Sequence, residues 1–159
     1  MNAREIADVI ERAMTSKDLE ALSAVWADDI VFHSPVTPVA FRGKLALAEL
    51  MTHVLAGFET WERTFVIADE QKAVFGAKGR IGGRDVELAE LIRLNAEGRV
   101  SEISITGRPL AGVAAIAAVA APHLAARRSR IRGWIAGFMS RGLPGGLALG
   151  DRLITRLAR

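Results

Sequence analysis

The chain has 159 residues, the length of one ordinary domain with an appendage, so a single hydrophobic core is expected. Half of the residues are hydrophobic and a quarter are charged, which excludes a disordered chain, and the lack of cysteine excludes disulfides, thiolate metal sites and a cysteine nucleophile. The net charge of +3 hides an asymmetry, because residues 126–159 hold eight arginines and a single acid, Asp151.

The first two predicted elements are helices. Residues 1–8 mix charges and lack the apolar stretch of a secretion signal, which predicts a cytoplasmic location. Apolar side chains at three- and four-residue spacing predict an amphipathic helix over residues 3–14. A second helix comes directly after it, capped by Ser16 or Asp18. Its predicted inner stripe is Leu19, Leu22, Val25 and Trp26.

The middle of the chain predicts strands around a third helix. Residues 30–34 form a short segment that begins with β-branched side chains and is ended by Pro35. This pattern is typical of an edge or entry strand. The segment to Gly43 is expected to be a loop with a short extended piece around Phe41. A helix over residues 45–55 then stops at Gly57. After this helix the spacing of the apolar residues is no longer helical. Turn signals divide the next part of the chain into four predicted strands, residues 60–68, 72–81, 84–94 and 99–106, which would form an antiparallel meander.

The C-terminal third divides into two segments. Residues 109–125 are mostly alanine and predict an apolar packing helix, with an apolar run far shorter than the roughly 20 residues that span a bilayer. Residues 126–159 predict a basic amphipathic helical tail that breaks at residues 142–146.

Together these elements predict an α+β fold for residues 1–108. Three helices packed on one face of a strongly curved antiparallel sheet would close a cone, a cystatin-like α+β barrel roll, with a C-terminal helical extension. A small apolar pocket is expected inside the cone.

Three segments carry a resemblance to a known superfamily. Residues 18–32 (DLEALSAVWADDIVF), 41–44 (FRGK) and 92–100 (IRLNAEGRV) resemble the nuclear transport factor 2-like superfamily, and specifically its SnoaL-like or ketosteroid isomerase-like members. The resemblance covers roughly residues 3–108. It implies the fold more specifically than the function, because this scaffold hosts isomerases, dehydratases, epoxide hydrolases, cyclases and binding proteins.

The resemblance assigns chemical roles to positions of this chain. In ketosteroid isomerase an aspartate moves a proton while a tyrosine and a protonated aspartic acid stabilise the enolate oxygen. Here the base falls on Ser34, the tyrosine on Ile10 and the third group on Glu90, so one of three groups retains a suitable side chain. The epoxide hydrolases use an arginine between two aspartates. In this chain the only aspartate on the later predicted strands is Asp85, which lies beside Arg84. The position on the last strand that aligns with the second aspartate is an isoleucine.

Glu90 is the one candidate catalytic residue. If it faces the pocket, apolar neighbours on its own strand and the next surround the carboxyl and raise its pKa. A one-residue change of register would instead place Glu90 on the outer face, paired with Arg93, Arg80 or a neighbouring subunit.

The predicted pocket residues are aromatic and aliphatic, with a single hydroxyl. Each of them could equally be plain core. They are Trp26, Phe32, Ser34, Phe41, Leu50, Trp61, Phe75, Ile92, Ile103 and Ile105. The three histidines are scattered and no carboxylates are spaced as a pair, so neither a metal site nor a cofactor is expected.

The tail is a candidate surface for a membrane or a partner. Its predicted contact residues are Arg127, Arg128, Arg130, Arg132, Trp134 and Phe138. A cationic amphipathic helix of this kind can lie on an anionic membrane, fold back over the domain and its pocket mouth, or pack against a partner. Nucleic acid is the least favoured partner because no recognisable binding motif accompanies the arginines.

Three functions are compatible with these patterns. The first is a binding module for a small apolar molecule, homodimeric through the outer sheet face. The second is an enzyme of isomerase, dehydratase or hydrolase type that uses Glu90 as acid or base on a hydrophobic substrate. The third is a membrane-surface or scaffolding protein that acts through residues 126–159 and associates with membranes from the cytoplasm.

Overall fold

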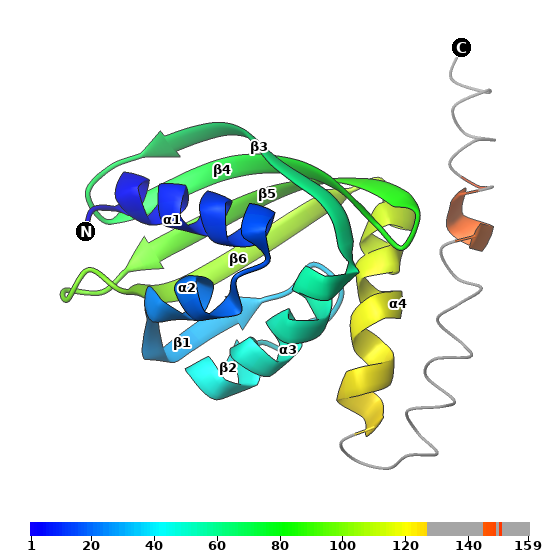
Figure 1. Cartoon of the computed structure of the whole chain (residues 1–159), viewed down its shortest axis with the longest axis horizontal. Helices are drawn as coiled ribbons and strands as arrows, with labels where there is room; N and C mark the ends of the chain where they lie inside the picture. The colour runs from blue at the N-terminus through cyan, green and yellow to red at the C-terminus, as the bar shows by residue number, and fades with distance from the viewer. Residues whose placement is uncertain (127–144, 149, 151–159) are drawn as a thin grey trace.

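A curved six-stranded sheet forms the wall of the described domain. The computed structural model describes residues 1–126, 145–148 and 150 (Figure 1). The sheet has the strand order β2-β1-β6-β5-β4-β3. The strands are β1 (Trp26–His33), β2 (Phe41–Arg42), β3 (Phe58–Ala68), β4 (Lys72–Ile81), β5 (Arg84–Leu94) and β6 (Val100–Arg108). Strands β3 to β6 form the expected antiparallel meander.

The sheet is mixed, which corrects the expectation of a purely antiparallel one. Strand β1 pairs antiparallel with β2 but parallel with β6, with Phe32 opposite Ile103. The chain leaves β1, passes through α3 (Lys44–Gly57) and the meander, and returns beside β1 in the same direction, so the last strand closes the sheet with a parallel pair. A parallel pair needs such a long connection, whereas sequence periodicity reports only strands and turns.

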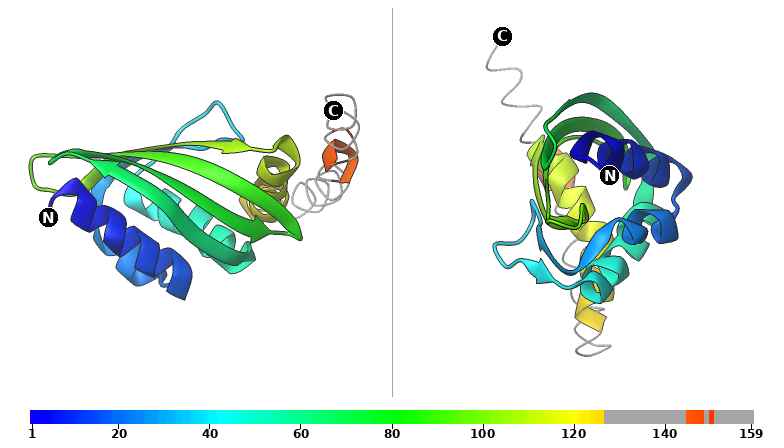
Figure 2. Two further views of the ribbon diagram at one scale, coloured as in Figure 1. Left: turned by 90° about the horizontal axis from the view of Figure 1, so that it is seen from above. Right: turned by 90° about the vertical axis from the view of Figure 1, so that its left-hand side faces the viewer.

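Three helices pack on one face of this sheet (Figure 2). They are α1 (Ala3–Ser16), α2 (Leu19–Ala24) and α3. Helix α1 begins with a capping box in which the Asn2 side chain accepts from the Glu5 amide and the Glu5 side chain accepts from the Asn2 amide. The Asp18 side chain caps α2 by accepting from the Ala21 amide at 2.9 Å.

The second helix is shorter than the apolar stripe predicted. It ends at Ala24, Val25 is its C-cap, and Trp26 begins β1 opposite Val100. Trp26 is still buried, so the sequence pattern correctly identified an inward side chain but assigned it to the wrong element. A period of 3.6 and a period of two cannot be told apart over the last one or two apolar residues of a stripe.

A fourth helix, α4 (Leu110–Ala126), closes one end of the cone by packing against α3, β5 and β6. Glycines allow the backbones to approach closely. A Cβ at Gly57 would lie 2.6 Å from Val119, and a Cβ at Gly107 would lie 3.0 Å from Val113. On α4 itself, a Cβ at Gly112 would lie 2.9 Å from the Cβ of Val86. The expected apolar packing helix is therefore an integral part of the domain.

The predicted tail falls almost wholly outside the described residues. Arg127, Arg128, Arg130, Arg132, Trp134 and Phe138 all lie there, so the membrane and partner roles expected for them stay predictions. Within the described ranges, no helix combines the length and the hydrophobicity needed to cross a bilayer.

Candidate functional site

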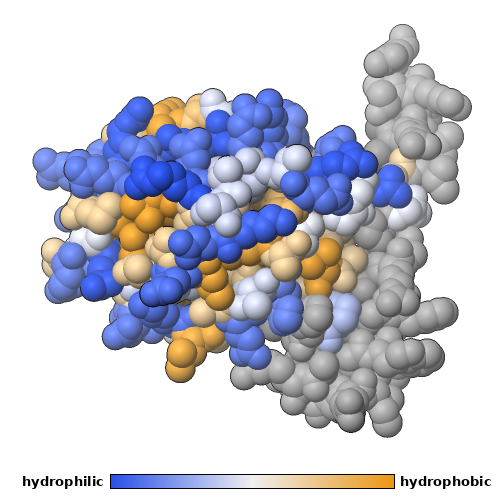
Figure 3. Space-filling model, viewed as in Figure 1, coloured by the Kyte–Doolittle hydropathy of each residue, from blue (hydrophilic) through white to orange (hydrophobic). Residues whose placement is uncertain are grey.

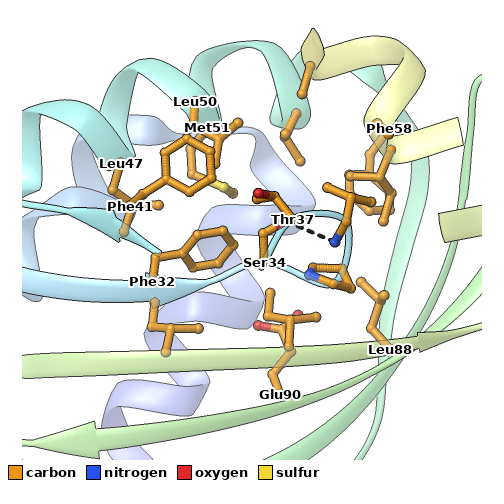
Figure 4. Close-up of a pocket in the computed structure, with 18 of the residues that line it drawn as sticks. Phe32, Ser34, Thr37, Phe41, Leu47, Leu50, Met51, Phe58, Leu88 and Glu90 are labelled. Atoms are coloured by element: carbon orange, nitrogen blue, oxygen red, sulfur yellow. Dashed lines mark hydrogen bonds between the residues drawn. The ribbon is translucent and has the colours of Figure 1, made fainter. Parts of the chain in front are cut away.

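The cone holds a partly open apolar pocket of about 240 Å³ between the sheet and the helices. Side chains of α1, α2, α3 and α4 line it together with side chains of β1, β5 and β6. Figure 4 shows Glu90 and Leu88 rising from β5 toward Leu47, Leu50 and Met51 of α3 on the opposite wall. The lining is almost entirely hydrocarbon, so a molecule in this pocket would be held mainly by burial of apolar surface.

The structure brings most of the predicted pocket residues together. Eight of the candidate residues line this pocket: Trp26, Phe32, Ser34, Phe41, Leu50, Glu90, Ile103 and Ile105. The rings of Phe32 and Phe41 meet in a tilted arrangement, with centroids 6.1 Å apart. This pairing forms the wall where β1 and β2 join.

Three predicted pocket residues lie in the core instead. Trp61, Phe75 and Ile92 are buried but do not line the pocket. They stand on β3, β4 and β5, the strands across which α1 packs. The alternation along a strand predicts which face a side chain takes, but not whether a helix or a cavity lies above it.

Sequence reasoning missed two whole segments of the lining, besides the single residues Met14, Leu22 and Phe58. One is the loop after β1, where Pro35, Val36 and Thr37 reach the pocket. The other is α4, which contributes Ile116, Ala117, Ala120 and Ala121. The helical stripe of α3 was recognised, and its spacing would have been enough to add Leu47, Met51 and Val54 to Leu50. No sequence signal identifies alanines of a packing helix as pocket residues.

Glu90 is the only buried charged or polar residue of the described part of the chain, with 7% of its surface exposed. It lies opposite Phe75 on β4 and Ile105 on β6, so all three side chains share the inner face of the sheet. No hydrogen bond or ion pair within the described ranges reaches its carboxyl. Burial raises the pKa of Glu90 to about 7, because the charged form loses its hydration and gains no partner.

The observed register of β5 with β4 and β6 excludes the alternative in which Glu90 lies on the outer face of the sheet and pairs with Arg80 or Arg93. Arg80 bonds to Glu59 and Asp85, with the Arg80 Nη1 atom 2.8 Å from the Asp85 carboxylate. Arg93 pairs with Glu102, its Nε atom 3.3 Å from the carboxylate. Asp85 is thus a surface ion-pair partner and lines no wall of this pocket. The two-aspartate arrangement of the epoxide hydrolases is not assembled.

The loop after β1 supplies hydroxyl groups to the pocket. The Ser34 Oγ atom accepts a hydrogen bond from the Val36 amide at 3.2 Å, and Figure 4 shows Ser34 and Thr37 beside the cavity. The Thr37 Oγ1 atom likewise accepts from the Val39 amide at 3.2 Å. Because each oxygen serves as an acceptor, each hydroxyl retains its own hydrogen for donation.

The three positions to which the isomerase resemblance assigned chemistry meet in this one pocket. Ile10 reaches it from α1, Ser34 from the loop and Glu90 from β5. Only Glu90 is a carboxylic acid. Among the described residues, no group of three or more histidine, cysteine or acidic side chains could hold a metal ion.

The cone of three helices on a curved mixed sheet is a cystatin-like fold, and together with the match to a SnoaL-like family model it makes the chain a member of the nuclear transport factor 2-like superfamily. A family model of the SnoaL-like domain matches residues 6–103. The chain belongs to the SnoaL-like domain family.

Solved structures share the fold. A steroid delta-isomerase from Pseudomonas aeruginosa is 24% identical with a TM-score of 0.71, covering 80% of this chain and 95% of that one. A cystatin-like protein from Silicibacter pomeroyi is 19% identical with a TM-score of 0.69, covering 80% and 87%. The epoxide hydrolase/cyclase-like enzyme SalBIII, which has a role in pyran ring formation in salinomycin, is 16% identical with a TM-score of 0.58, covering 66% and 89%.

These likenesses establish the fold, since all three identities are below 25%. No curated protein matches the sequence. The neighbours include an isomerase and a cyclase-like enzyme, so the shared scaffold carries several chemistries.

Proposed function

We propose that this domain binds a small apolar molecule bearing one oxygen atom, such as a ketone, and that the Glu90 carboxylic acid donates a hydrogen bond to that oxygen. The observation that carries the proposal is a lone carboxyl, 7% exposed and without a partner in the described part of the chain, in a hydrocarbon-lined pocket. A buried polar group of this kind is stabilised when a ligand satisfies it.

The pocket volume supports a small ligand. An apolar cavity of about 150 Å³ accepts one benzene ring, or about 25 Å³ per carbon atom. By the same ratio, 240 Å³ accommodates on the order of ten non-hydrogen atoms. This is the size of a two-ring ketone, and it is well below the size of a four-ring steroid.

The protonation of Glu90 gives this binding a defined pH dependence. Since its pKa is about 7, the carboxyl is protonated below pH 7 and can donate a hydrogen bond to the ligand. Above pH 7 it is a carboxylate, which has no proton to donate and repels the ligand oxygen. A neutral ketone should therefore bind with constant affinity at low pH. Its affinity should fall about tenfold for each pH unit above the pKa.

Titration with 2-decalone, followed by the change in tryptophan fluorescence, tests the proposal because Trp26, one of three tryptophans, lines the pocket. We expect the affinity of the unmodified protein to fall between about pH 7 and about pH 9. In Glu90→Gln the amide still donates but does not titrate, so binding should persist without that fall. No binding to the unmodified protein below pH 7, or an equal fall in Glu90→Gln, would contradict the proposal.

The pKa of Glu90 also supports a second function, proton transfer on such a ketone. A carboxyl that is half ionised near pH 7 can both take and return a proton. Its carboxylate would remove a proton from the carbon beside the carbonyl, leaving the C–H electron pair on the substrate as an enolate, and the carboxylic acid so formed would return a proton to carbon. Deuterium incorporation into 2-decalone in heavy water, measured by NMR, should then require Glu90 and disappear in Glu90→Gln. Equal incorporation by the variant would exclude Glu90 as the acid or base.

A further inference from the structure

One wall of the pocket comes from outside the segment that matches the family. The SnoaL-like match ends at residue 103, whereas α4 occupies Leu110–Ala126. Four positions on two successive turns of α4 nevertheless line the cavity: Ile116, Ala117, Ala120 and Ala121. The pocket is thus completed by an element that the family segment does not contain.

This wall is fixed in position. The close approaches at Gly57, Gly107 and Gly112 join α4 to α3, to β6 and to the start of β5. The Val113 and Ile116 side chains of α4 are 7% and 8% exposed, as buried as the sheet residues beneath them. Interiors packed this closely resist displacement, so α4 acts as a wall of set position and not as a movable cover.

The side chains on this wall are small where they meet the cavity. The adjoining wall of α3 presents Leu50, Met51 and Val54, whereas α4 presents three alanines and one isoleucine. A leucine in place of one alanine would add three carbons, or about 75 Å³ at about 25 Å³ per carbon. That is about a third of the 240 Å³ available.

We infer that α4 determines the largest ligand that the pocket admits, with Ala117, Ala120 and Ile116 as the specificity-determining residues. The inference rests on the proposed function and adds the size class of the ligand. Short side chains at Ala117 and Ala120 leave room for a second ring, and Ile116 excludes a third. Filling or emptying a well-packed pocket by a few methylene groups changes affinity by about tenfold or more.

Three ketones of increasing size test this inference: cyclohexanone, 2-decalone and 1-acenaphthenone, which have one, two and three rings. Ala117→Leu should retain cyclohexanone within about twofold and lose at least about tenfold in affinity for 2-decalone. Ile116→Ala would enlarge the pocket to about 315 Å³, so it should gain about tenfold for 1-acenaphthenone while keeping 2-decalone. Ala118→Leu is the matched control, because Ala118 lies on the same helix and does not line the pocket, and it should leave all three affinities unchanged.

The outcomes separate this inference from the proposed function. If the unmodified protein binds none of the three ketones, the proposed function fails. If it binds 2-decalone but Ala117→Leu and Ile116→Ala both leave all three affinities within about twofold of those of the unmodified protein, α4 does not set ligand size and this inference fails alone. A loss of folding in Ala117→Leu, seen as a lost thermal transition, leaves Ile116→Ala to decide, since that change removes atoms and adds none.

Discussion

The Glu90 carboxyl is surrounded by apolar side chains and has no compensating charge nearby. Its neighbours across the ladder are Phe75 and Ile105, and no cation lies within bonding distance in the described part of the chain. Burial alone therefore raises its pKa to about 7. A perturbed carboxyl in an apolar cavity is more typical of a functional site than of a structural one.

This burial should make the free protein less stable as the pH rises. The Glu90 pKa is 4.5 in the unfolded chain and about 7 in the folded one, so folding takes up a proton between these values. The contribution of Glu90 to the free energy of unfolding falls across this window, by about 3 kcal/mol in total. Denaturant titrations at about pH 5 and about pH 8 measure the difference.

Two variants test whether Glu90 causes this pH dependence of stability. Glu90→Gln should remove most of the difference between the two pH values, because the amide does not titrate. Glu97→Gln is the control, since Glu97 is exposed in the turn before β6 and should leave the difference intact. If both variants retain the unmodified pH dependence, Glu90 is not the group that titrates.

The sequence predicts much of the site at the level of single residues. The period of two correctly placed Glu90, Ile103 and Ile105 on one face, and β-strand sterics make that pattern dependable. It failed at Trp61, Phe75 and Ile92, because a buried position beneath α1 and a buried position beside a cavity have the same sequence signature.

At the level of elements, the glycines around α4 determine how the domain is closed. Gly112 is the most constrained of them, because a Cβ there would meet the Asp85 carbonyl oxygen and lie 2.9 Å from the Cβ of Val86. Gly112→Ala should lower the free energy of unfolding by about 1–3 kcal/mol through overpacking, despite the better helix propensity of alanine.

Thermal unfolding measures this effect against a matched glycine. Gly146 is an exposed helical glycine of the described residues, and a Cβ added there would have nothing within 4 Å, so Gly146→Ala should leave stability unchanged or slightly raise it. Equal melting temperatures for Gly112→Ala and the unmodified protein would show that α4 does not pack as closely as described.

Element boundaries were predictable where a chemical signal marks them. Asp18 at the start of α2, Gly57 at the end of α3 and the Gly82-Gly83 turn all lie where the sequence indicated. The parallel pairing of β1 with β6 was not predictable, because nothing local in either strand records which distant strand lies beside it. The same holds for the docking of α4 across the end of the cone.

At the level of the whole molecule, the two faces of the sheet differ. The helix-bearing side is mostly hydrophilic, with separate apolar patches (Figure 3). The other side carries an exposed apolar band in which Ile67 lies opposite Val74, with Phe65 beside them. Charges at its borders are paired within the chain, as in Glu62 with Lys78 at 3.2 Å. An apolar band of this kind is typical of an interface.

We therefore expect a homodimer formed through this outer face. Ile67 is 72% exposed in the single chain, and Ile67→Asp should shift the sedimentation coefficient from that of a dimer to that of a monomer. Leu45→Asp is the matched control, because Leu45 is 87% exposed on α3, away from the sheet, and should leave the dimer intact. A monomer for the unmodified chain would contradict this expectation.

The proposed site depends most on the state of Glu90 within an apolar cavity that a ketone can fill. An NMR titration of the Glu90 side-chain carboxyl carbon, without and with saturating 2-decalone, tests it most directly. We predict a midpoint near pH 7 for the free protein and a higher midpoint with the ketone, because the ligand excludes water and accepts a hydrogen bond from the acid form. A midpoint near pH 4.5 that the ketone does not move would contradict it.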